Sequence, residues 1–258
     1  MRTVTATRYV TPLREGGSLP ALVEADDDGL YVLKFRGAGQ GPKALVAELI
    51  GGEIARALGL DVPEIVLVNL DAELARTEPD AEIQDLIRAS AGLNLALDYL
   101  PGSVTFDPLA HAPVAALASA IVWHDAFVAN VDRTPRNANL LWWHRKLWLI
   151  DHGAALIFHH QWRDPAVQGR AGFPLVRDHV LLPWAKQIAE ADARLAPLLS
   201  AERLRGIVAL VPDAWLAPEP GFETPAALRA AYERYFQSRL VAPRPFVEEA
   251  LVAAAQHV

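Results

Sequence analysis

Two short stretches in the middle of the chain carry oxygen-bearing side chains at a spacing suited to metal and phosphate chemistry. Asp132 is followed five residues later by Asn137, and Asp151 begins an Asp-His-Gly turn fourteen residues beyond that. Phosphoryl transfer needs a group that orients the acceptor hydroxyl and oxygen ligands that hold Mg²⁺ against the ATP phosphates. We therefore predict Asp132 as the catalytic base, Asn137 and Asp151 as metal ligands, and ATP and Mg²⁺ as cofactors.

A competing pair with the same spacing lies just upstream. Asp125 is followed five residues later by Asn130, but the sequence around Asp125 continues an apolar helical pattern and lacks turn residues. Asp132 instead has Arg, Pro and Asn neighbours that are typical of a loop. We therefore prefer Asp132 as the base and interpret Asp125 as a helix residue that supports the loop. Arg133 or Arg136 could stabilise phosphate charge or anchor this loop.

A lysine and a glutamate upstream fit the other half of an ATP site. Lys34 lies in the strand-like run Leu-Tyr-Val-Leu-Lys-Phe, and Glu48 lies in the helical pattern that follows, with Glu53 as the alternative partner. A lysine in such a strand can contact the α- and β-phosphates and pair with a helix carboxylate. Taken alone, Lys34 is better explained as an edge-strand lysine that prevents aggregation. The downstream motif favours the functional interpretation.

A glycine-containing turn near the N-terminus is a weaker candidate for phosphate contact. Gly16, Gly17 and Ser18 separate two β-like segments. Glycine allows backbone N–H groups to approach phosphates closely. The cluster does not match the pattern of a P-loop, and a plain hairpin turn explains it equally well.

The end of the last N-terminal strand is the predicted contact for the adenine base. Asp98, Tyr99 and Leu100 precede Pro-Gly-Ser, where a hinge between two lobes would expose backbone groups. The alternative is an ordinary strand end. The histidines at positions 144, 159 and 160 lack the spacing of metal ligands, so we interpret them as surface or loop residues.

Hydrophobic periodicity divides the chain into a β-rich part and a helical part, which indicates an α+β fold. The first hundred residues are predicted to form a small antiparallel sheet and one clear helix, at 8–13, 19–24, 30–35, 43–58, 64–70 and 93–100. Residues 71–91 are polar and irregular, with room for one helix. Beyond residue 101, a hairpin at 139–143 and 147–150 interrupts helices at 111–129, 178–198, 200–210, 224–239 and 243–256.

Composition narrows the possible functions. The net charge is −7, and residues 1–100 hold nine Lys and Arg against 16 Asp and Glu, so no basic stripe indicates nucleic-acid binding. The chain contains no cysteine, which excludes disulfides and thiolate metal sites. No apolar stretch approaches the roughly 20 residues that span a bilayer, and no signal-peptide pattern opens the chain. We expect a cytoplasmic protein without a membrane span.

These motifs together resemble the HipA-like serine/threonine kinases and, more distantly, the phosphatidylinositol kinases. The matching stretches are 30–35, 47–64, 130–137 and 150–153. The resemblance implies a two-lobed protein-kinase-like fold in one domain, 1–258, with a β-rich N-lobe at about 1–100 and a mainly helical C-lobe at about 101–258. It also implies MgATP, with catalytic, metal and phosphate roles for Asp132, Asn137, Asp151 and Lys34.

The sequence departs from the family in two respects. Thr134 stands where many relatives have histidine, and the chain is much shorter than full-length HipA toxins. The toxin role, the toxins' protein substrate and an antitoxin or DNA-complex partner therefore do not carry over. The predicted acceptor is a protein Ser/Thr hydroxyl, with a small molecule or lipid headgroup as the alternative. A nucleotide-binding pseudokinase or interaction module is the second alternative.

Overall fold

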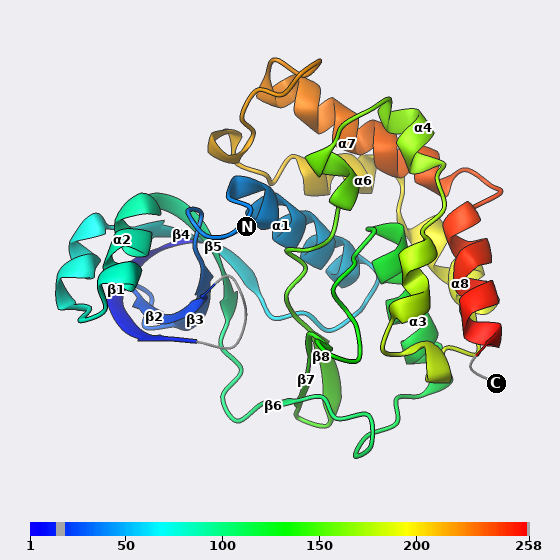
Figure 1. Cartoon of the computed structure of the whole chain (residues 1–258), viewed down its shortest axis with the longest axis horizontal. Coiled ribbons are helices and arrows are strands. Elements are labelled where there is room, and N and C mark those ends of the chain that lie inside the picture. Colours follow the sequence, from blue (N-terminus) through cyan, green and yellow to red (C-terminus); the bar gives the residue numbers. More distant parts are fainter. Residues whose placement is uncertain (14–18, 257–258) are drawn as a thin grey trace.

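The N-terminal part of the computed structural model, which describes residues 1–13 and 19–256, is a closed five-stranded β-barrel. Its strands run in the order β1-β2-β3-β5-β4 (Figure 1). Their bounds are β1 (Thr3–Pro12), β2 (Ala21–Ala25), β3 (Leu30–Lys34), β4 (Ile65–Leu70) and β5 (Gly92–Asp98). Alternate residues point inward, as Ala21, Val23 and Ala25 do on β2.

The sheet differs from the predicted antiparallel sheet in one respect, because one of its strand pairs is parallel and closes the sheet into a barrel. β1 begins at Thr3, five residues earlier than predicted, and residues Thr3–Thr5 pair in parallel with residues Leu67–Asn69 of β4. This pairing uses the backbone groups that two edge strands would otherwise expose. A second core, formed by inward-facing residues such as Val23, Leu33 and Val68, fills the barrel.

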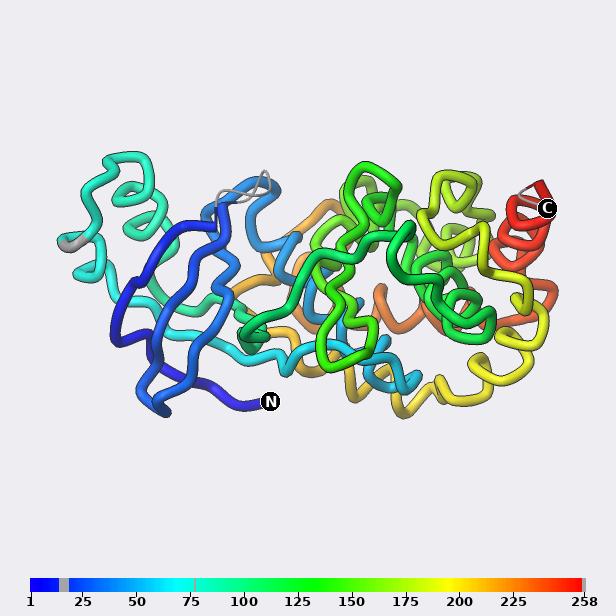
Figure 2. Tube along the Cα trace, turned by 90° about the horizontal axis from the view of Figure 1, so that it is seen from below, coloured from blue at the N-terminus to red at the C-terminus, as the bar shows by residue number. Residues whose placement is uncertain are grey.

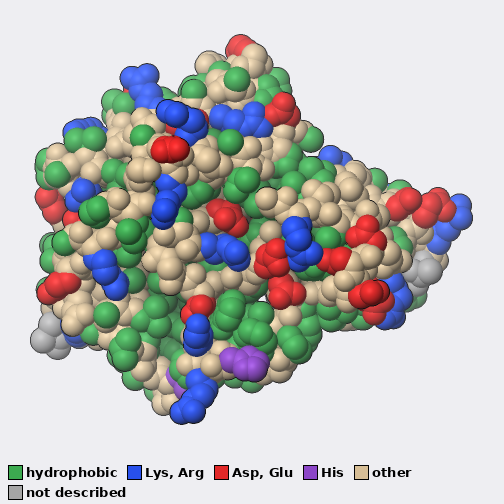
Figure 3. All heavy atoms as spheres, turned by 180° about the vertical axis from the view of Figure 1, so that it is seen from behind, with side chains coloured by type: hydrophobic (Ala, Val, Ile, Leu, Met, Phe, Trp, Pro, Cys, Tyr) green, Lys and Arg blue, Asp and Glu red, His purple; other side chains and the backbone are tan. Residues whose placement is uncertain are grey.

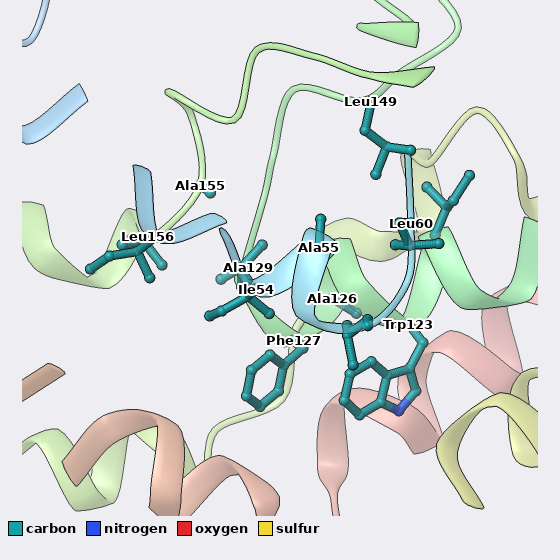
Figure 4. Packing of buried hydrophobic residues seen from close by; sticks show 14 of the residues in the cluster. Ile54, Ala55, Leu60, Trp123, Ala126, Phe127, Ala129, Leu149, Ala155 and Leu156 are labelled. Carbon is teal, nitrogen blue, oxygen red and sulfur yellow. The ribbon is translucent and has the colours of Figure 1, made fainter. Parts of the chain in front are cut away.

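Helix α1 (Pro42–Ala57) connects the barrel to the helical part. It begins after Gly41, with a proline in its first turn, where a missing N–H donor costs nothing. Ten of its residues are buried, and the seven apolar ones with side chains belong to the same hydrophobic core as the C-terminal helices. Figure 4 shows Ile54 and Ala55 of α1 beside Phe127 and Ala126 of α3. α1 is therefore fixed within the body that carries the downstream motifs.

The helical part continues the long axis of the molecule away from the barrel (Figure 2). Its α-helices are α3 (Ala115–Phe127), α4 (Pro165–Gly169), α5 (Ile188–Leu195), α6 (Ala201–Val208), α7 (Pro225–Leu240) and α8 (Pro245–Ala255). In the barrel part, α2 (Ala81–Ala89) is the one helix for which the polar segment 71–91 left room. A 3₁₀ turn, Ala72–Thr77, precedes it.

The long helix predicted over 178–198 is wrong. Only Ile188–Leu195 is α-helical, and the preceding segment forms short 3₁₀ turns at Pro174–Asp178 and Leu182–Trp184. Pro183 lacks the N–H that a continuing helix would need and its ring clashes with the preceding turn. The apolar residues of this segment are still buried, so hydrophobic periodicity predicted their burial correctly and their secondary structure incorrectly.

The predicted hairpin is present as β7 (Leu140–Trp143) and β8 (Lys146–Leu149), and β6 (Val104–Thr105) adds a third strand. The indole N–H of Trp143 donates to the carbonyl oxygen of Pro101, which ties the hairpin to the segment that joins the two parts. On the face shown in Figure 3, basic and acidic side chains are interspersed. Within the described ranges, no helix is long and apolar enough to cross a membrane.

Candidate active site

A buried lysine joins the barrel to the two carboxylates that the sequence singled out. Lys34 is the last residue of β3, and its Nζ lies 2.5 Å from Asp151 Oδ1 and 3.2 Å from Glu48 Oε2. The Lys34 and Glu48 side chains are 10% and 1% exposed. This contact confirms the predicted pairing of Lys34 with Glu48. The alternative partner, Glu53, pairs with Arg56 instead.

The charges in this cluster stabilise one another. Burial alone would lower the pKa of Lys34, but the carboxylates of Glu48 and Asp151 outweigh it and raise that pKa. Burial alone would raise the pKa of Glu48, whereas the Lys34 ammonium and His152 lower it to about 2. At neutral pH the cluster therefore holds a cationic lysine between carboxylates, and this lysine can contact phosphate.

His152, which follows Asp151, is fully buried against α1. An added Cβ on Gly51 would lie 2.9 Å from His152 Cβ, so the helix accepts this side chain only because glycine leaves space. His152 Nδ1 also lies 3.5 Å from Glu48 Oε1. Burial lowers the pKa of His152, although Glu48 opposes the effect. This close contact with Gly51, called the His152 seat below, fixes the turn that presents Asp151.

A Gly51→Ala substitution tests this seat. The added methyl group collides with His152, and we expect a loss of about 1–3 kcal/mol in the free energy of unfolding. Gly206 is a matched control, because it also lies in a helix, α6, and an added Cβ there meets nothing within 4 Å. Gly206→Ala should stabilise by about 0.5–1 kcal/mol. Urea unfolding of both variants measures the difference, and equal changes would contradict the seat.

Asp125 anchors the loop that follows α3. It lies in the last turn of α3, fully buried, as the predicted supporting helix residue should. Its carboxylate accepts hydrogen bonds from Arg133 Nε at 2.5 Å, His179 Nε2 at 2.9 Å and Asn130 Nδ2 at 2.9 Å. Burial would raise the pKa of Asp125, but Arg133 and the histidines hold it well below the usual range. Arg133 is thus a buried loop anchor, while Arg136 is exposed.

Asp132 lies at the surface of this loop, half-buried. Its Oδ2 accepts hydrogen bonds from Asn137 Nδ2 at 2.8 Å and from Asn139 Nδ2 at 3.2 Å. Its backbone N–H donates to Asn130 Oδ1, and the same asparagine contacts Asp125. Both Asp-x-x-x-x-Asn pairs therefore form the same side-chain hydrogen bond. They differ in burial, and the Asp132 pair is the one that reaches solvent.

Asn139, a residue not predicted from the sequence, joins the loop that carries Asp132 to the segment that carries Asp151. Its carbonyl oxygen accepts a hydrogen bond from the N–H of Ile150, the residue before Asp151, at 3.1 Å. Arg133 donates to the same carbonyl. Asn139 and Asp151 both have left-handed backbone angles, with φ of 49° and 56°. The available signal was a second asparagine two residues after Asn137, since asparagine tolerates this conformation better than most residues.

The structure supports the predicted adenine and phosphate contacts less well than the Lys34 and Asp132 sites. The N–H groups of Asp98 and Tyr99 already donate to the carbonyl oxygens of Glu64 and Leu30, at 2.8 and 2.9 Å. The side chain of Leu100 is buried. The carbonyl oxygen of Leu100 also accepts a hydrogen bond from the N–H of Ser103, at 3.2 Å. These three backbone groups of the predicted adenine contact are therefore already paired within the fold. Residues Gly16, Gly17 and Ser18 lie outside the described part of the chain.

The interpretation of all three histidines as surface or loop residues is wrong for His159. It is fully buried, and its Nδ1 lies 2.9 Å from the Tyr232 hydroxyl oxygen in α7. Burial holds the pKa of His159 well below its usual range. In the described ranges, no three His, Cys, Asp or Glu side chains gather to hold a metal ion. A metal here would depend on an asparagine and an aspartate.

Comparisons with known proteins identify the fold and the family of the chain. The chain resembles the crystal structure of a Helicobacter pylori proinflammatory kinase, CtkA, with a TM-score of 0.58 and 13% sequence identity. The likeness covers 99% of this chain and 98% of that one, so the fold is shared over its full extent. No curated protein sequence matches. The family model of the HipA-like kinases matches residues 7–235. The chain therefore belongs to the HipA-like kinase family and is a phosphotransferase.

Proposed function

We propose that this protein transfers the γ-phosphate of MgATP to a hydroxyl acceptor, with Asp132 as the base. The observation that carries the proposal is the half-open carboxylate of Asp132, with one oxygen held by two asparagine amides. It is linked through Asn139 to the strand that presents Asp151 beside Lys34. Kinase chemistry needs these parts in fixed relative positions more than it needs covalent participation by the protein.

Each residue has a distinct task in this proposal. Asp132 Oδ1 accepts the hydrogen bond of the acceptor hydroxyl, while Oδ2 remains held by asparagine. Lys34, released from Asp151, pairs with the phosphates, and Glu48 keeps its ammonium group in place. Asp98, Tyr99 and Leu100 line the adenine end. The candidate phosphate contacts also include Gly16, Gly17 and Ser18.

The donor set fits Mg²⁺. Asp151 and Asn137 offer hard oxygen ligands; the Asp151 side chain is 38% exposed and Asn137 is exposed, so bound waters can complete the coordination. When bound, Mg²⁺ neutralises charge that develops on the phosphates. Asn137 would turn its side-chain oxygen toward the ion, and Asp151 would exchange Lys34 for it. We propose a protein Ser/Thr hydroxyl as acceptor, in a cytoplasmic setting, on the strength of the family.

Nucleotide-dependent thermal stabilisation of an Asp151→Asn variant tests the metal role. Wild type should gain stability with ATP plus Mg²⁺ and much less with ATP plus EDTA, since only binding to the folded state raises the unfolding midpoint. Asp151→Asn should lose the Mg²⁺-dependent part of the gain. A control, Asp164→Asn, changes an exposed helix-capping aspartate and should keep it.

Two outcomes would contradict the proposal. Equal stabilisation of Asp151→Asn and wild type by MgATP would remove Asp151 from the metal site. Stabilisation of wild type without any consumption of ATP would indicate a nucleotide-binding pseudokinase instead.

A further inference from the structure

We propose that Asn139 is a positioning residue that holds the carboxylate of Asp132 in the orientation for transfer. This inference rests on the proposed function, because it gives Asn139 a task toward the proposed base. Asn139 Nδ2 contacts Asp132 twice, at Oδ2 over 3.2 Å and at the backbone carbonyl oxygen over 3.3 Å. These contacts fix both the side chain and the backbone of Asp132.

The two asparagines that contact Asp132 differ in burial and in other commitments. Asn137 is exposed, and its amide group has one partner, Asp132 Oδ2. Asn139 is only 9% exposed, and its carbonyl oxygen also accepts from the N–H of Ile150. Were Asn137 to turn toward a metal ion and give up its hydrogen bond to Asp132, the hydrogen bond from Asn139 would still keep Oδ2 occupied.

The backbone explains why this position suits asparagine. At a φ of 49°, most side chains are strained, whereas glycine is unstrained and asparagine is tolerated. Asparagine adds a donor that reaches back to Asp132, seven residues earlier in the chain. With Oδ2 held, Oδ1 is the oxygen directed to the acceptor. A base held in this way has less orientational freedom to lose each time an acceptor binds.

Glycine is the substitution that separates the amide from the backbone. Asn139→Gly keeps the left-handed conformation and removes the donor; Asn139→Asp keeps the shape and replaces the donor with a negative charge. We expect Asn139→Gly to lower kcat for phosphate release from MgATP about 10- to 100-fold, as loss of supporting contacts does in comparable sites. The Michaelis constant for MgATP should change less than about twofold, and Asn139→Asp should lower kcat at least as much.

A coupling measurement distinguishes positioning from a structural role. In an Asp132→Asn background, Asn139→Gly should have little further effect on kcat, because there is no carboxylate left to orient. The unfolding midpoint of Asn139→Gly should stay close to that of wild type. An unchanged kcat, or parallel losses in stability and in MgATP affinity, would overturn the inference.

Failure of the inference is distinguishable from failure of the proposed function. If wild type turns over ATP and Asp132→Asn slows it, but Asn139→Gly does not, only the role of Asn139 is wrong. If wild type consumes no ATP, the proposed function fails and the role of Asn139 fails with it.

Discussion

An Asp132→Asn variant should fold normally and transfer phosphate about 10²- to 10⁴-fold more slowly than wild type, the usual loss when a general base is removed. The side chain is half-buried, and an amide oxygen can still accept the hydrogen bonds from Asn137 and Asn139. The free energy of unfolding should therefore change by less than about 1 kcal/mol. Steady-state phosphate release from MgATP and urea unfolding measure the two quantities.

The same variant should still bind MgATP, because neither Lys34 nor Asp151 contacts the Asp132 side chain in the structure. Its nucleotide-dependent shift in unfolding midpoint should match that of wild type. A variant that retains full turnover would show that another group accepts the hydroxyl proton. A variant that fails to fold would show that Asp132 is a structural residue.

The corresponding substitution of Asp125, seven residues earlier, should instead lower the free energy of unfolding. Asp125→Asn removes the negative charge that faces the buried guanidinium of Arg133, whose side chain is 0% exposed. An unpaired buried charge costs about 3–5 kcal/mol, so Asp125→Asn should lower the free energy of unfolding by roughly this amount. Urea unfolding at pH 7 measures it directly.

The loop itself should also loosen in this variant, because Arg133 holds it to Asn139 and to Ile150. Turnover of ATP should fall together with stability, and stabilising conditions should restore part of both. If Asp125→Asn kept its stability and lost turnover alone, Asp125 would be the base. The Asp132→Asn and Asp125→Asn variants together therefore decide which of the two aspartates is the base.

Local patterns predicted most of the elements that position the site. Strand alternation placed Lys34 on β3, helical spacing placed Glu48 on α1, and the structure brings the two within 3.2 Å. The choice of a helix for Asp125 and a loop for Asp132 also followed from neighbouring residues, and both are confirmed. These features depend on contacts within a few residues, which a single sequence records.

Features that depend on the geometry of the folded chain, rather than on local composition, could not be predicted. The barrel closes because β1 pairs with β4, more than 60 residues away. The position of Asn139 against Asp132 requires a left-handed turn that only the folded loop imposes. The burial of His152 depends on Gly51, in a helix one hundred residues earlier.

The helix predicted over 178–198 has a different explanation. It was predicted from hydrophobic periodicity alone, and Pro183 prevents a continuous helix there.

A crystal structure of the protein with Mg²⁺ and a non-hydrolysable ATP analogue would show which aspartate faces the transferred phosphate. We expect Mg²⁺ on the side-chain oxygens of Asn137 and Asp151, Lys34 turned from Asp151 to the phosphates, and Asp132 Oδ1 facing the terminal phosphate. Asp125 should remain buried against Arg133, as in the present structure. A nucleotide bound elsewhere, or a terminal phosphate directed at a residue other than Asp132, would contradict this expectation.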